Sequence, residues 1–126
     1  MRFTCGKKYR LRSTKTISAL FSEGEGFFNF PIRVKYHIIQ SDESALRCAF
    51  IVPKRIFKRA VDRNRVKRLM REAFRLNKHE LMTELYAGKT VEMIWIYADK
   101  RILPQSVISK AALQIFKRLI KKENSR

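Results

Sequence analysis

The amino-acid sequence predicts a single α+β domain, a sandwich in which helices pack on a mostly antiparallel sheet. Its 126 residues fit one domain, and a chain of this length buries roughly two-thirds of its unfolded surface. Segments with an apolar period of two alternate with segments whose apolar residues recur at about 100° per residue, which predicts both strands and helices. No repeat, low-complexity tract or linker divides the sequence. We therefore expect one domain over residues 1–126, with a basic N-terminal arm at 1–12 and a basic tail at 121–126.

The first predicted elements are the arm and a short helix. Residues 2–12 contain five basic residues and no acid, and they show no apolar period, which favours an extended arm. Ser13 suits the N-cap of a helix through residues 16–21, which the glycines of 24–26 should end. Three apolar residues share one side of this helix, namely Ile17, Leu20 and Phe21.

Two strands are expected next. Residues 32–38 alternate apolar and polar side chains, the pattern of a half-buried strand, and residues 40–44 are typical of a turn. Residues 46–52 form the returning strand, which Pro53 ends because proline has no N–H for the ladder. We expect these two strands to pair as an antiparallel hairpin.

A long basic helix follows. From Val66 onward the apolar residues recur every three or four positions, which predicts an amphipathic helix with one face on the core. The helix should continue, or restart, through residues 79–86 and close at 87–88. Its expected core residues are Val66, Leu69, Met70, Ala73 and Phe74.

The last two elements complete the sandwich. Residues 91–97 are almost wholly apolar, as in a central strand covered on both faces. A final helix should begin at 104–106 and end in basic residues, and its expected core residues are Ile108, Ala112, Ile115, Phe116 and Leu119. The strand at 46–52, the basic helix and the strand at 91–97 form a β-α-β crossover, for which the general rule predicts a right-handed connection.

Positive charge is concentrated in one part of the chain. The formal net charge is +18 and the pI is about 10.6. Eleven of the 29 basic residues lie between 54 and 78, where Asp62 and Glu72 are the only acids, so this fifth of the chain carries +9. The partner of such a foldable, strongly basic chain should be a polyanion.

The basic helix concentrates these cations on the side opposite its core residues. Cations three or four residues apart lie about 5 to 6 Å from one another at Cβ and repel by a few tenths of a kcal/mol per pair. An ordinary solvated face would mix signs, whereas this one is rich in arginine, which suits phosphate recognition. We therefore favour a nucleic-acid surface over a solvated face for Asn64, Lys67, Arg68, Arg71 and Arg75, flanked by Arg63 and Arg65.

The sequence offers no catalytic or metal site in the protein itself. A nuclease needs a general acid and a general base within reach of one phosphate. The positions of His37 and His79 in the sequence give no reason to expect these two side chains near each other. No Gly-rich phosphate loop, HExxH motif or nucleophile elbow is present. Cys48 lies in an apolar strand and should be a small buried hydrophobe, and Cys5 should be a free thiol in the arm. A self-sufficient protein nuclease is therefore the disfavoured alternative.

The location of the protein is also predicted. No run approaches the roughly 20 apolar residues of a membrane span, and the first residues lack the apolar core of a signal peptide. We expect a cytoplasmic protein without a membrane partner.

One stretch closely resembles a known family. Residues 52–55 read Val-Pro-Lys-Arg, and residues 60–74 read Ala-Val-Asp-Arg-Asn-Arg-Val-Lys-Arg-Leu-Met-Arg-Glu-Ala-Phe. This stretch is similar to the Arg-Asn-Arg motif region of the protein component of bacterial ribonuclease P. The resemblance covers roughly residues 9–120, because further segments fall in the family's order, namely 17–24, 34–36, 95–97 and 112–116.

The resemblance implies a function that composition does not supply. The protein would bind the catalytic RNA subunit of ribonuclease P and the 5′ leader of precursor tRNA, and it would promote removal of the leader. The RNA would perform the hydrolysis with Mg²⁺, held mainly by RNA, and the protein itself would be monomeric. A ribosomal protein or a general RNA chaperone is the alternative that explains the charge but not the motif. The implied fold resembles domain 2 of ribosomal protein S5, with a left-handed crossover in place of the right-handed one.

The resemblance also assigns residues. Contacts with the catalytic RNA are expected from Lys54, Arg55, Arg63, Asn64, Arg65, Lys67, Arg68 and Arg71. A leader-binding cleft between the first helix and the sheet is expected from Ile17, Phe21, Val34, Tyr36 and Ile51.

Two features depart from the family's pattern. Ile17 stands where many members have an aromatic residue, so only apolar contact is expected there. The turn at 57–59 is one residue longer than usual, and no role is carried onto it.

Overall fold

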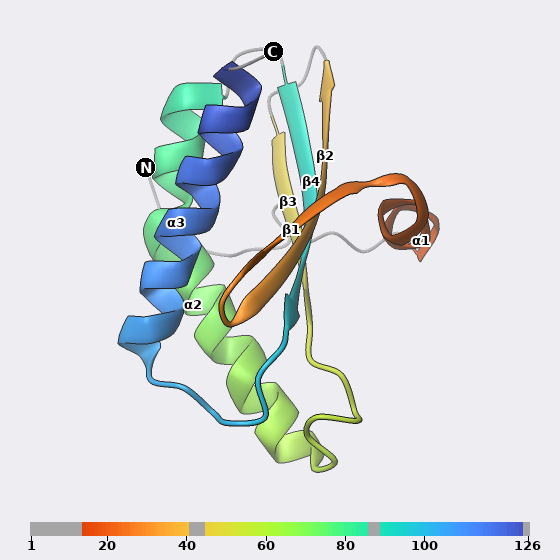
Figure 1. Cartoon of the computed structure of the whole chain (residues 1–126), viewed down its shortest axis with the longest axis vertical. Helices are drawn as coiled ribbons and strands as arrows, with labels where there is room; N and C mark the ends of the chain where they lie inside the picture. The colour runs from red at the N-terminus through yellow and green to blue at the C-terminus, as the bar shows by residue number, and fades with distance from the viewer. Residues whose placement is uncertain (1–13, 41–44, 86–88, 125–126) are drawn as a thin grey trace.

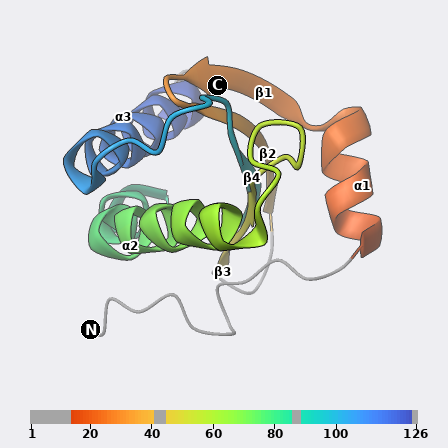
Figure 2. The ribbon, with the colours of Figure 1, turned by 90° about the horizontal axis from the view of Figure 1, so that it is seen from below.

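Seven elements follow one another along the described residues of the computed structural model, which are 14–40, 45–85 and 89–124. In Figures 1 and 2 the helix at Thr14–Glu23 lies on one face of the sheet, and the helices at Ala60–Leu85 and Gln105–Asn124 lie on the other. The predicted mostly antiparallel α+β sandwich is confirmed. The elements are α1 (Thr14–Glu23), β1 (Glu25–Asn29), β2 (Ile32–Gln40), β3 (Ala45–Ile51), α2 (Ala60–Leu85), β4 (Lys89–Tyr97) and α3 (Gln105–Asn124).

The strand order is β1-β2-β4-β3, so the expected hairpin between β2 and β3 is wrong. β4 lies between them, antiparallel to β2 and parallel to β3. The physical reason lies in β4 itself, where five of the seven residues from Val91 to Tyr97 are buried hydrophobics. Such a strand needs neighbours on both edges and cover on both faces. The predicted central position of β4 is confirmed, and the turn at 41–44 lies outside the described residues.

Strand β1 was not predicted. It pairs antiparallel with β2, from Glu25 opposite Tyr36 to Asn29 opposite Ile32. Residues 24–26 suggested only a helix stop, and a strand of five residues before Pro31 is too short to show a clear period. β1 forms an edge of the sheet.

Helix α1 ends where its glycine was expected to end it. The Gly24 N–H donates to the Leu20 carbonyl at 3.0 Å. A Cβ at Gly24 would stand 2.6 Å from that oxygen, so a larger residue would displace the start of β1. The proposed cap, Ser13, lies outside the described residues.

The crossover from β3 through α2 to β4 is left-handed. In Figure 1 β4 points downward and β3 is parallel to it, so both strands run toward the viewer of Figure 2, which is seen from below. In Figure 2 α2 lies to the left of the sheet and β4 lies above β3. This agrees with the family resemblance and contradicts the general rule of right-handed crossovers.

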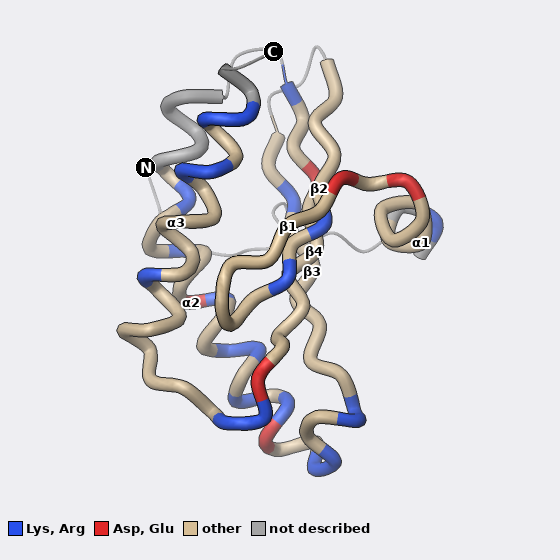
Figure 3. The backbone as a smooth tube through the Cα atoms, in the orientation of Figure 1, with Lys and Arg blue, Asp and Glu red and all other residues tan. Residues whose placement is uncertain are grey.

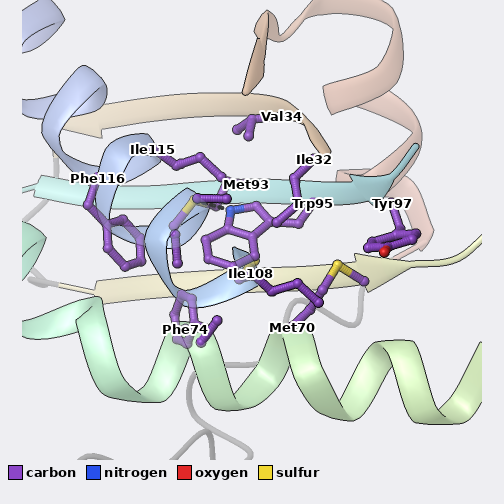
Figure 4. Close-up of a cluster of buried hydrophobic side chains, with 14 of the residues drawn as sticks. Ile32, Val34, Met70, Phe74, Met93, Trp95, Tyr97, Ile108, Ile115 and Phe116 are labelled. Carbon is purple, nitrogen blue, oxygen red and sulfur yellow. Dashed lines mark hydrogen bonds between the residues drawn. The ribbon is translucent and has the colours of Figure 1, made fainter. Parts of the chain in front are cut away.

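The main core lies between the sheet and helices α2 and α3, with Trp95 at its centre (Figure 4). The Trp95 ring centroid lies 5.6 Å from Phe50, 5.7 Å from Phe74 and 5.7 Å from Phe116. The edge-to-face contacts with Phe50 and Phe74 add about 0.5 to 1.5 kcal/mol each beyond the burial of apolar area. The aromatic cluster therefore ties α2 and α3 to β4.

The predicted core faces of both long helices are confirmed. α2 is one continuous helix, and it buries Val66, Met70, Ala73 and Phe74 completely while Leu69 packs at the margin. All five expected core residues of α3 are fully buried. The predicted helix closure at 87–88 lies outside the described part of the chain. None of the helices in the described part combines the length and apolarity that crossing a membrane requires.

Two substitutions on α2 test this assignment of faces. Phe74→Ala should lower the free energy of unfolding by about 3 to 5 kcal/mol, because it leaves a cavity against Trp95. Leu76 is 44% exposed on the same helix, so Leu76→Ala should change it by no more than about 0.5 kcal/mol. Urea denaturation measures both variants. Equal losses in the two variants would show that the faces are assigned incorrectly.

Candidate nucleic-acid interface

The N-terminal half of α2 and the loop before it carry the predicted RNA-binding residues on one side of the molecule. Lys54 and Arg55 are exposed in the loop, and Asn64, Arg65 and Arg68 are exposed on the helix. Arg63, Lys67 and Arg71 are half-buried. In Figure 3 basic residues gather along the lower part of α2 and the loop below it. The structure therefore brings together the eight residues assigned to the catalytic RNA.

Arg63 has a structural role that sequence reasoning missed. Its Nη1 donates to the carbonyl oxygens of Phe57 at 2.8 Å and Lys58 at 2.9 Å. Phe57 is buried, with its ring centroid 6.0 Å from that of Tyr97. The longer turn at 57–59 is thus fixed by the Arg63 hydrogen bonds and by the burial of the Phe57 ring. The burial of Phe57 could have been inferred from the sequence, because Phe57 is an apolar residue among cations.

The two acids of the basic stretch are paired within it. Asp62 lies 4.0 Å from Arg59, and Glu72 accepts hydrogen bonds from Arg75. The Arg75 hydrogen bonds lower the pKa of the Glu72 carboxyl, and Glu72 raises the pKa of Arg75.

Other cations of the same helix remain available to a ligand. Within the described part of the chain, Arg65, Lys67, Arg68 and Arg71 have no acid within 4.0 Å. Their charges repel one another when no anion is present. Because these charges are not neutralised by nearby acids, the surface favours the binding of a polyanion.

The face of the sheet under α1 is a second surface with mixed character. Leu20 and Ile94 are buried there, with Ile17, Ala49, Ile51 and Ile96 packed around them.

Charged side chains project from the same face. Register pairs Lys35 with Ile94 and Arg33 with Ile96, so both cations project from this face. Glu92 also lies on this face, between His37 and Arg47 in register.

The expected leader cleft is only partly formed, because Val34 and Tyr36 lie on the opposite face of the sheet. Both are buried in the main core, and the Tyr36 hydroxyl donates to Glu25 Oε2 at 2.6 Å. Alternate side chains of β2 point to opposite faces of the sheet, and the sequence assignment chose the set that faces the main core. Arg33, Lys35 and His37 occupy the α1 face instead. Ile17 and Ile51 do lie there.

A groove of about 450 Å³ runs along the edge of α1. Its walls come from α1, β2 and β4 and include Lys15, His37, Ile39 and Glu92. Phe21 is 45% exposed on the same helix. The lining combines apolar side chains with the cation Lys15 and the acids Glu23 and Glu92, so the groove is of mixed charge, and the cations Arg33 and Lys35 lie elsewhere on this face of the sheet.

The two histidines lie on different elements. His37 lies on β2 and His79 on α2, and the described residues bring together no group of three or more His, Cys, Asp or Glu side chains. Cys48 is buried in β3, as expected. Cys5 lies outside the described residues.

Comparisons with known proteins decide the family. The family model for ribonuclease P matches residues 5–122. The chain belongs to this family. A ribonuclease P protein component from Porphyromonas gingivalis is 45% identical over 80 residues, which cover 63% of this chain and 58% of that protein. This chain thus matches little more than half the length of that relative. One from an Exiguobacterium species is 31% identical over 112 residues, covering 89% of this chain and 90% of that protein.

Solved ribonuclease P proteins share the fold. The Thermotoga maritima protein matches with a TM-score of 0.68 and 25% identity, covering 86% of this chain and 96% of that one. The Staphylococcus aureus protein matches with a TM-score of 0.66 and 22% identity, covering 90% and 96%. The left-handed crossover and the cationic α2 therefore lie in a framework shared with other members of the ribonuclease P family.

The role of Arg63 can be tested against its neighbour on α2. Arg63→Gln should lower the free energy of unfolding by about 1 to 2 kcal/mol, because two carbonyls lose a charged donor. Arg65→Gln should change it by about 0.5 kcal/mol or less. Chemical denaturation measures both, and an unchanged Arg63→Gln protein would contradict the structural role of this guanidinium.

Proposed function

We propose that this chain is the protein subunit of ribonuclease P, which binds the catalytic RNA and promotes removal of the 5′ leader from precursor tRNA. The observation that carries the proposal is the arginine-rich face of α2, on which Arg65, Lys67, Arg68 and Arg71 have no acid within 4.0 Å among the described residues. Family membership makes the catalytic RNA the natural polyanion for this face. The contacts are assigned to Lys54, Arg55, Arg63, Asn64, Arg65, Lys67, Arg68 and Arg71.

In this proposal the RNA performs the hydrolysis. Mg²⁺ prefers several oxygen ligands, and the described side chains bring no such cluster together. The family resemblance implies that the ion is held mainly by RNA, where it would supply the nucleophile and charge stabilisation. The protein's own cations would reduce repulsion between the phosphates of enzyme RNA and substrate, which lowers the Mg²⁺ concentration needed. The protein is proposed to act as a monomer in the cytoplasm.

The proposed leader surface is the α1 face of the sheet. Ile17 and Ile51 supply apolar contact there, and Lys15, Arg33 and Lys35 supply charge. Phe21 on α1 is exposed enough to stack on a base, and such stacking tolerates sequence variation. These contacts suit a leader whose sequence differs among precursors.

The alternative, a ribosomal protein or a general RNA chaperone, is not favoured by the family match. Recovery of bound RNA from cells distinguishes the two. Enrichment of ribosomal RNA without the ribonuclease P RNA would favour the alternative.

Reconstitution tests the proposal directly. Precursor-tRNA cleavage by the catalytic RNA should accelerate at low Mg²⁺ when the protein is added, and Arg68→Ala should need a higher protein concentration for the same rate. Purified protein freed of all RNA should not cleave the precursor. Cleavage that persists without RNA would instead support a self-sufficient nuclease.

Binding to the catalytic RNA should depend strongly on salt. If about six phosphates are contacted, the slope of log affinity against log salt should be about −4 to −5, at roughly 0.7 to 0.9 per phosphate. Filter binding or fluorescence anisotropy over a range of KCl concentrations measures the slope. A nearly flat dependence would contradict the electrostatic assignment of the α2 face.

A further inference from the structure

The hairpin of β1 and β2 exposes two aromatic rings at its end. Phe28 and Phe30 are each 49% exposed. Phe27 packs against the main core, so the alternation along β1 directs Phe28 to the other face, opposite Arg33 in register. Two large rings at one turn present a surface for stacking.

Helix α3 holds this hairpin in a fixed position. Asn29 Nδ2 donates to Gln114 Oε1 at 3.0 Å, and Arg118 Nη1 donates to the Phe28 carbonyl at 2.7 Å. The Arg118 guanidinium also lies 4.1 Å from the centroid of the Phe27 ring. The backbone that carries the exposed rings is therefore held by α3, which reduces the conformational entropy that the protein loses when a ligand stacks on them.

The charge around the rings identifies the chemistry of their ligand. The sequence from Gly26 to Gln40 contains no acid, and neither does the sequence from Gln105 to Lys122 on α3. Arg33 is exposed opposite Phe28 in register, and Arg118 is exposed on α3, where its guanidinium lies over the Phe27 ring. A second copy of this chain would bring +18 against +18. Aromatic rings among cations are typical of surfaces that bind single-stranded nucleic acid.

We propose that Phe28 and Phe30, with Arg33, form a second stacking site for single-stranded RNA, onto which the 5′ leader continues from the α1 face. This inference rests on the proposed function, because it extends the leader surface. Register places Phe28, Arg33, Ile96 and Ile51 in one row across the sheet. Phe28 is two strand spacings, roughly 10 Å, from Ile96, which packs in the α1 cluster. One strand of RNA can therefore reach both places.

The experiment measures the affinity of the reconstituted holoenzyme for precursor tRNAs whose leaders have about four or about twelve nucleotides. The double variant F28S/F30S is compared with the wild type and with L76S, which removes an equally exposed apolar side chain from α2. The double variant should bind the long-leader precursor about fivefold more weakly, or worse, and should bind the short-leader precursor as the wild type does. L76S should match the wild type with both substrates.

A second variant separates charge from stacking. R33Q should also weaken binding of the long leader and should reduce the salt slope by about 1. Thermal melts establish that all variants fold. An unchanged affinity of F28S/F30S for the long leader would overturn the inference while leaving the proposed function intact. If the RNA affinity of F28S/F30S is unchanged and the variant also loses self-association in sedimentation, the rings bind a second copy of the chain, and the inference is again overturned. A wild-type protein that fails to raise the affinity of the catalytic RNA for either precursor would overturn the proposed function as well.

Discussion

The like-charge repulsion along α2 is the constraint on which the rest of the structure depends. Arg65, Lys67, Arg68 and Arg71 lie within two turns of one helix, and the described residues offer them no acidic partner. Each neighbouring pair costs a few tenths of a kcal/mol. On the opposite side, burial of Val66, Met70, Ala73 and Phe74 stabilises the helix, with about 1.5 to 3 kcal/mol for each large side chain. The core therefore outweighs the repulsion and leaves the cations available to RNA.

The two faces of the central strand β4 pack against different helices. One of its faces anchors the aromatic core under α2 and α3, and the other packs Ile94 against Leu20 of α1. A cationic helix face and a sheet surface on the other side, here proposed for a single strand of RNA, can therefore be built on one small domain. The cations of α2 would position the catalytic RNA, and the α1 face, extended to the edge of β1, would hold the substrate. Arg118 connects the edge of β1 to α3, so the second surface is also supported by the core.

The sequence predicted the helices and the cationic face because their signals are local. A period of 3.6 residues identified the buried side of α2, and the run of arginines identified the other side. Sheet order could not be predicted in the same way, because pairing of β4 with both β2 and β3 depends on contacts distant in sequence. Val34 and Tyr36 show a further limit. Alternation separates two sets of side chains on β2, but it does not say which set faces α1, and the sequence assignment chose the wrong set. The hydrogen bonds from Arg63 to the turn before α2 left no periodic signal, although the buried Phe57 could have been suspected.

The central claim is that α2 has one face for stability and another for RNA, and the double variant R65Q/R68Q tests it most directly. Its free energy of unfolding at low salt should equal or slightly exceed that of the wild type, because two mutually repelling charges are removed. Its affinity for the catalytic RNA should fall, with the salt slope reduced by about 2, one for each lost phosphate contact. A loss of stability comparable to the loss of RNA affinity would contradict the account, because it would show that these arginines hold the fold together.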